Sequence, residues 1–151
     1  MWRVLITGSR TWDNHLVIQK ALAQIAQDHD WRVMVVHGDC PDGADAIAKD
    51  WARRMIGTGV DHDPYPADWK KHGKPAGHIR DKEMVDRGAD ECLAFIHRCV
   101  KPTCRLTYPH GSHGTTATAG YAEKAGIPTR RWTDLSRPTY DRPLLKLGVG
   151  S

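Results

Sequence analysis

The segment RVLITGSR, residues 3–10, decides the fold. A short run rich in aliphatic and β-branched residues is followed by Gly8 and two polar residues, which is typical of a buried strand that ends in a tight turn. The run shows no alternation of apolar and polar residues, so we expect both of its faces to be covered, as in a parallel sheet. A second segment of this kind, Arg32–His37, ends at Gly38.

Segments with helical spacing of apolar residues alternate with further strand segments. The first helix is expected to begin at Asp13 or Asn14, both good N-cap residues, and the second near Asp42. The remaining expected elements are a short strand over Val60–Pro64, a loop over Tyr65–Pro75, a helix over Ala76–Arg87, a strand over Glu91–Ile96, a long loop over His97–Gly114, a helix over Thr115–Ala125 and a strand over Ile127–Trp132.

This alternation predicts an α/β fold, a Rossmann-like doubly wound parallel sheet of five strands with helices on both faces. We expect the strand order 3-2-1-4-5. Residues 1–132 would form this single Rossmann-like domain. Residues 133–151 fall outside it as a C-terminal extension, either a tail or an arm that packs on a neighbour, and we favour the arm.

Composition narrows the class of protein. The chain has 151 residues, of which 40% are hydrophobic and 26% charged, which excludes a disordered tail, a collagen-like rod and a coiled coil. No apolar run reaches the ~20 residues that span a bilayer, and the first strand begins without a signal-peptide pattern. We therefore expect a cytoplasmic protein without membrane contact, whose cysteines are reduced.

The net charge is +4, from 22 basic and 18 acidic residues. The two signs are interspersed along the chain, whereas nucleic-acid-binding proteins concentrate basic residues on one face. The charge balance therefore permits an anionic ligand without favouring DNA or RNA.

Ligands of such sheets bind beyond the carboxyl ends of the strands, where the strand order reverses. Glycines and small polar residues follow the strands at three places there: Gly8–Arg10, Gly38–Asp45 and Gly111–Thr115. Glycines let the backbone approach a phosphate, and a helix N-terminus offers free N–H groups. The predicted ligand-binding residues are Gly8, Ser9, Gly111, Ser112, Gly114 and Thr115 as the phosphate cradle, Arg10 and Arg80 as counter-charges, Asp39 and Asp42 for ribose or base, and Gly38 and Gly43 in the wall beside them.

Each of these assignments has a simpler alternative. Glycine-rich turns are common, a surface Arg10 is usually only solvated, and periodicity alone places Arg80 on a solvated helix face. Asp39 and Asp42 would also complement a helix dipole, and we expect Asp45 to be structural. Two tryptophans flank the predicted site and could stack on a base or serve only in packing: Trp12 and Trp69.

The long loop contains the pattern C-x4-C-x5-H-x2-H, formed by Cys99, Cys104, His110 and His113. Two thiolates and two imidazoles suffice for a tetrahedral structural zinc ion, which would support the phosphate loop rather than perform chemistry. The alternatives are exposed thiols with polar loop histidines, or a disulfide. The predicted binding function itself requires no cofactor.

In their order along the chain, these motifs resemble the SLOG superfamily of Rossmann-like nucleotide-binding proteins. The resemblance covers residues 3–132 and is carried by Gly8-Ser9-Arg10, His37-Gly38-Asp39, Gly43-Ala44-Asp45, Arg80-Asp81-Lys82-Glu83-Met84 and Gly111-Ser112-His113-Gly114-Thr115. It is strongest to the small YspA/YpsA-related branch found in bacteria and phages. Lonely Guy phosphoribohydrolases, the DNA-processing protein DprA and nucleotide sensors of anti-phage defence are further members. The resemblance implies a homodimer or higher homo-oligomer.

The resemblance to Lonely Guy enzymes is incomplete. Arg80 and Met84 match their R-x-x-x-M frame, but Thr118 stands where the motif P-G-G-x-G-T-x-x-E has its glutamate. Cleavage of a base–ribose bond needs a carboxylate, so we predict no catalytic residue and a protein that senses or sequesters a nucleotide or nucleotide-derived signal. The alternatives are a nucleoside 5′-monophosphate phosphoribohydrolase and a DprA-like module that binds single-stranded nucleic acid.

Overall fold

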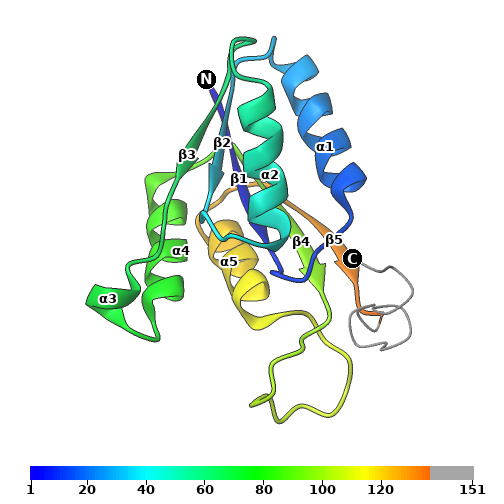
Figure 1. The fold of residues 1–151 in the computed structure, drawn as a ribbon, viewed down its shortest axis with the longest axis vertical. Helices are drawn as coiled ribbons and strands as arrows, with labels where there is room; N and C mark the ends of the chain where they lie inside the picture. Colours follow the sequence, from blue (N-terminus) through cyan, green and yellow to red (C-terminus); the bar gives the residue numbers. More distant parts are fainter. Residues whose placement is uncertain (137–151) are drawn as a thin grey trace.

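Five parallel strands form one sheet in the order β3-β2-β1-β4-β5 in the computed structural model, which describes residues 1–136 (Figure 1). This confirms the predicted fold class and strand order. The strands are β1 (Trp2–Gly8), β2 (Val33–His37), β3 (Val60–Pro64), β4 (Glu91–His97) and β5 (Thr129–Asp134).

Helices cover both faces of the sheet. On one face, α1 and α2 pack on a core that includes Val4, Ile6 and Phe95. On the other face, α4 and α5 pack on Leu5 and Cys92. The helices are α1 (His15–Asp28), α2 (Gly43–Arg54), α3 (Trp69–His72), α4 (Ala76–Arg87) and α5 (His113–Lys124).

β1 lies at the centre of the sheet, between β2 and β4. Its residues Val4, Leu5 and Ile6 have no exposed surface, because successive side chains point into the two cores in turn. This double burial explains why the strand is continuously apolar. Because β1 and β4 are parallel neighbours, the polar residues after β1 lie at the same sheet edge as those after β4.

The structure differs from the predicted elements at several places. The expected loop Tyr65–Pro75 contains the short helix α3, whose start is capped by Asp68 accepting from the Lys71 N–H at 3.0 Å. Helix α5 begins two residues earlier than expected, at His113. Strand β5 begins at Thr129 because Ile127 instead closes the end of α5, donating to the Ala122 carbonyl at 2.9 Å.

The predicted domain boundary at residue 132 falls inside a strand, since β5 continues to Asp134. The arm expected from the C-terminal extension lies outside the described residues, apart from 133–136. Within the described part of the chain, no helix combines the length and the apolar character needed to cross a membrane.

Replacing Gly8 with alanine should destabilise the fold. A Cβ atom at this position would overlap the Ala44 Cβ and lie 3.2 Å from the Phe95 carbonyl oxygen. We expect Gly8→Ala to lower the free energy of unfolding by about 1–3 kcal/mol in urea titrations, as overpacking usually does.

The matched control is Gly120→Ala in α5, where an added Cβ meets no atom within 4 Å. It should raise the free energy of unfolding by about 0.5–1 kcal/mol, because alanine favours helix over glycine. Equal effects of the two substitutions would contradict the packing described for Gly8.

Candidate functional site

A cavity of about 680 Å³ opens beyond β1 and β4, the neighbouring strands at which the strand order reverses. Its walls come from residues 6–11, from α3 and α4, from the loop after β4 and from the first turn of α5. Rossmann-like folds bind ligands in this crevice. The predicted ligand-binding residues on its walls are Gly8, Ser9, Arg10, Arg80, Ser112, Gly114 and Thr115.

Ser9 joins three of these segments. Its N–H donates to the Phe95 carbonyl at 2.9 Å, and its hydroxyl accepts from the His97 N–H at 2.9 Å. The same hydroxyl lies 2.5 Å from that of Ser112. The turn after β1, the end of β4 and the start of α5 therefore form one connected wall.

Helix α5 begins without a side-chain cap. Ser112 occupies the N-cap position but makes no capping hydrogen bond, and its hydroxyl pairs with Ser9 instead. The first turn contains no acidic residue, and a Cβ on Gly114 would meet no atom within 4 Å. The first N–H groups of a helix have no acceptor within it and carry the positive end of its dipole, so this wall favours an anion.

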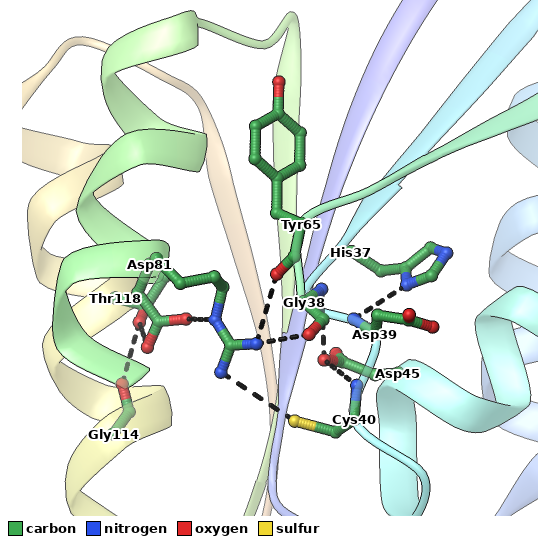
Figure 2. A network of polar contacts seen from close by, with 10 residues as sticks. His37, Gly38, Asp39, Cys40, Asp45, Tyr65, Asp81, Gly114 and Thr118 are labelled. Carbon is green, nitrogen blue, oxygen red and sulfur yellow. Dashed lines mark hydrogen bonds and ion pairs between the residues drawn. The ribbon is translucent and has the colours of Figure 1, made fainter. Parts of the chain in front are cut away.

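Arg80 of α4 is buried in the cavity wall, with 8% of its surface exposed. Its Nε donates to Asp81 Oδ1 at 2.7 Å, and its Nη1 donates to the carbonyl oxygens of Gly38 and Tyr65; Figure 2 shows this network. Burial opposes the charge, but Asp81, Cys40 and Asp45 together outweigh burial and raise the pKa of Arg80. Arg80 thus fixes α4 against the ends of β2 and β3, and its contact with phosphate stays a prediction.

Asp45 is an acidic group on the same wall, near the start of α2. Its Oδ2 accepts from the N–H groups of Gly38 at 3.1 Å and Cys40 at 3.4 Å, which agrees with its expected structural role (Figure 2). Burial raises the pKa of Asp45 from 3.8 to about 6, with Arg80 opposing the shift. Burial likewise raises the pKa of the Cys40 thiol. Reactive thiolates have lowered pKa values, so this cysteine does not resemble a nucleophile.

The residues predicted to read ribose or base lie away from the main cavity. Asp39 binds the Lys49 ammonium at 2.7 Å, which lowers the pKa of Asp39, and it lines a smaller hollow of about 330 Å³. Asp42 is exposed at the N-cap of α2. Three predicted glycines also lie outside the cavity lining, where they serve packing and turns: Gly38, Gly43 and Gly111.

The two candidate stacking tryptophans differ in their exposure to the cavity. Trp12 is 6% exposed and packs on Phe95 in the core. Trp69 is 50% exposed and lines the cavity, with the Arg10 guanidinium 6.0 Å from its ring centroid. Trp69 is therefore the tryptophan available to a ligand.

Several cavity residues were missed from the sequence. Gly77 and Met84 line the cavity together with Arg80, and their helical spacing from Arg80 could have found them. Asp81 also lines the cavity, but it follows Arg80 directly and has no such spacing. The exposed cations Lys74 and Lys101 also line it, as Arg10 does. No ion pair between described residues engages these three cations. Loop positions such as 74 and 101 carry no periodic signal.

The loop after β4 gathers Cys99, Cys104, His110 and His113, whose ligand atoms lie within 4.8 Å of one another. Cys104 Sγ lies 3.4 Å from Nε2 of His110 and also of His113, and the two Nε2 atoms are 3.2 Å apart. Cys99 Sγ is 3.6 Å from His113 Nε2. Both cysteines are free thiols, so the structure contains no disulfide here. This cluster has the composition and spacing of a metal-binding site.

Comparison with known proteins identifies the family. Residues 2–72 match the model of YAcAr, the YspA, cpYpsA-related SLOG family. The Gene 61 protein of Mycobacterium phage D29 is 43% identical over 136 residues, covering 89% of this chain and 98% of the phage protein. The chain belongs to this SLOG family. The predicted superfamily and its YspA-related branch are thereby confirmed.

In this SLOG protein, Thr118 makes a local polar contact in place of the glutamate of the Lonely Guy motif. Its buried hydroxyl lies 2.9 Å from the Gly114 carbonyl and 3.0 Å from Asp81 Oδ2, as Figure 2 shows. Asp81 lines the cavity, but its other oxygen accepts from Arg80. The Asp81 carboxylate is thus held by Arg80 at one oxygen, and its other oxygen shares the single Thr118 hydroxyl proton with the Gly114 carbonyl.

The raised pKa of Asp45 should appear in the pH dependence of stability. Native Asp45 keeps its proton to about pH 6, whereas the unfolded chain releases it near pH 3.8. The contribution of Asp45 to the free energy of unfolding is therefore lost as pH rises between these values. The Asp45→Asn variant lacks that loss. Its free energy of unfolding, relative to the parent protein, should rise by up to about 3 kcal/mol from pH 4 to pH 7. A difference that stays constant with pH in urea titrations would contradict this.

Proposed function

We propose that this SLOG protein binds a nucleotide or a nucleotide-derived signal in the cavity beyond β1 and β4, without hydrolysing it. One observation carries the proposal. The cavity joins an uncapped helix N-terminus, exposed cations and a half-exposed tryptophan within one hollow. Its volume of about 680 Å³ is within the usual range for small-molecule sites.

The phosphate would bind where Gly8–Arg10 meets the first turn of α5. Three features support this placement: the first turn has no side-chain cap, Gly114 leaves open space, and the Arg10 side chain is exposed nearby. Backbone N–H groups and the helix dipole stabilise a phosphate at such a position, and an arginine adds paired hydrogen bonds.

The base would stack on Trp69, across the cavity from α5. A tryptophan ring that is half exposed on a cavity wall provides a stacking surface, which contributes about 1–3 kcal/mol per base in single-strand-binding proteins. Every base has a π-face, so this contact supports nucleotide binding in general and selects no particular base.

We propose that the ligand is not hydrolysed because the carboxylates of the cavity are already engaged in hydrogen bonds. Asp45 accepts two backbone N–H groups, and Asp81 is held by Arg80 and Thr118. A glycosidic bond is cleaved with a carboxylate that is free to act on water or on the oxocarbenium ion. Sensing or sequestering a ligand needs only affinity, so we favour these roles over phosphoribohydrolase activity and over single-strand binding.

An acidic residue at the start of α5 tests the phosphate site without harming the helix. Gly114→Asp should lower affinity for nucleotides at least about 10-fold by repelling phosphate, while an acid in the first turn favours the helix itself. The matched control, Gly120→Asp, adds the same charge further along α5 and should bind as the parent protein does.

Binding can be measured by equilibrium dialysis against mononucleotides, dinucleotides and cyclic nucleotides, with both fractions identified by mass spectrometry. Recovery of an intact nucleotide supports the proposal. Release of free base would establish the hydrolase alternative, and failure to bind any nucleotide would overturn the proposal. Single-stranded DNA binding with a steep salt dependence would favour the DprA-like alternative.

Size-exclusion chromatography tests the homo-oligomer that family resemblance implies.

We further propose that the Cys2His2 cluster binds a zinc ion. A tetrahedral zinc ion about 2.3 Å from sulfur and about 2.0 Å from nitrogen separates its ligand atoms by about 3.3–3.8 Å, close to the spacings found. His110 Nδ1 donates to the Tyr108 carbonyl at 2.8 Å, which leaves Nε2 as the ligand atom. The mixed sulfur and nitrogen donors favour zinc over calcium or magnesium.

The purified protein should contain one zinc ion per chain by elemental analysis. Cys104→Ser should lose it, because a hydroxyl is a poor zinc ligand at neutral pH. Cys40→Ser, a cysteine outside the cluster, should keep it. A parent protein without metal, or with a Cys99–Cys104 disulfide detected by mass, would contradict this proposal.

A further inference from the structure

The loop over residues 98–112, here called the metal loop, belongs to both the metal cluster and the cavity. Figure 1 shows it extending beyond the carboxyl end of β4. Val100, Lys101 and Pro102 line the cavity, and in the chain they lie between the cluster residues Cys99 and Cys104. One wall of the proposed ligand site is therefore formed by residues that lie between two members of the proposed metal site.

The neck of the metal loop is tied to the domain by its own backbone. Arg98 and Gly111 form an antiparallel bridge, and the Cys99 N–H donates to the His110 carbonyl at 2.7 Å. The Ser112 N–H also donates to the His97 carbonyl at 3.0 Å. These bonds fix the two ends of the loop and leave its tip to be held by other means.

The tip, residues 100–109, has little else to hold it. Within the described part of the chain, its hydrogen bonds stay inside the loop and its cluster, as in the Cys104 N–H donating to the Lys101 carbonyl at 3.0 Å. None of its side chains belongs to the buried cores. A loop of this length needs a cross-link to keep one conformation. The cluster supplies that link, from Cys104 in the tip to His113 on α5.

His113 connects the cluster directly to the anion-binding wall. It is the first residue of α5, it lines the cavity, and its Nε2 is one of the four ligand atoms. Gly114 and Thr115, proposed to contact phosphate, follow it in the same turn. A metal ion in the cluster would therefore position this turn as well as the tip.

We infer that metal binding and ligand binding are coupled: the metal loop, when it holds its metal ion, completes the cavity and strengthens its affinity for a phosphate-bearing ligand. This inference rests on the proposed nucleotide-binding function. Two sites coupled through one structural element affect each other equally, so the ligand must also strengthen retention of the metal. Lys101 acts as a positioned cation of the site only in the metal-bound form.

The direct test compares the full-length protein loaded with one zinc ion and the same protein stripped by a chelator, both freed of excess metal. The nucleotide panel serves as the probe, and circular dichroism checks that the sheet and helices persist. We expect dissociation constants at least about 10-fold higher in the stripped protein. Equal affinities would overturn the coupling alone. Failure of the zinc-loaded protein to bind any nucleotide would overturn the proposed function and the coupling together.

The reciprocal measurement follows the metal ion instead of the ligand. Transfer of zinc from the loaded protein to a chromogenic chelator is followed with and without saturating nucleotide. We expect ligand to raise the apparent zinc affinity by the same factor that zinc raises ligand affinity. An unchanged zinc affinity would contradict the coupling.

A matched pair of loop variants tests the positioning of the cation. Lys101→Ala should weaken nucleotide binding several-fold in the zinc-loaded protein and have no effect in the stripped one. Arg105→Ala removes a like charge from the same loop, outside the cavity lining, and should leave affinity unchanged in both forms. Equal losses for Lys101→Ala with and without zinc would overturn the inference.

Discussion

The buried guanidinium of Arg80 is the constraint on which the site depends. A charge removed from water costs several kcal/mol unless it is paired and hydrogen-bonded, so its partners must keep their places. These partners come from the loop after β2, from the residue after β3 and from α4 itself. A Cβ on Gly38 would lie 2.6 Å from the guanidinium, which explains the glycine there. The cavity wall around Arg80 is therefore fixed before any ligand binds.

The strand order could be predicted because a buried parallel strand is apolar on both faces, as β1 is, and because helical spacing separates such strands. The fold then brought Ser9 and Ser112 to the same edge, and the structure joins their hydroxyls. Side-chain direction could not be predicted in this way. Asp39 turns to Lys49, which no local pattern indicates, and Arg80 turns inward from a helix whose polar residues otherwise resemble a solvated face. Trp69 was a stacking candidate from the sequence, but the short helix α3 on which it lies was not predicted.

The cavity is built from parts of unequal rigidity. The wall around Arg80 is held by hydrogen bonds to the residues after β2 and β3, and the wall at Ser9 by hydrogen bonds to β4. Its outer wall is the metal loop, whose tip has no place in the core. Elements that respond to ligands are drawn from the less stable parts of a protein, so the loop is where regulation would act. The two carboxylates of the cavity wall, Asp45 and Asp81, are both engaged in hydrogen bonds. This arrangement suits ligand binding rather than bond cleavage.

The central claim is that the cavity beyond the carboxyl ends of β1 and β4 is the ligand site. It is tested most directly by mapping backbone amide chemical shifts of the zinc-loaded protein during nucleotide titration. We predict the largest changes at Gly8–Arg10 and at Gly114 and Thr115, together with the indole N–H of Trp69. Changes concentrated instead around Asp39 and Lys49, in the smaller hollow, would contradict the claim and move the ligand site to the other side of α2.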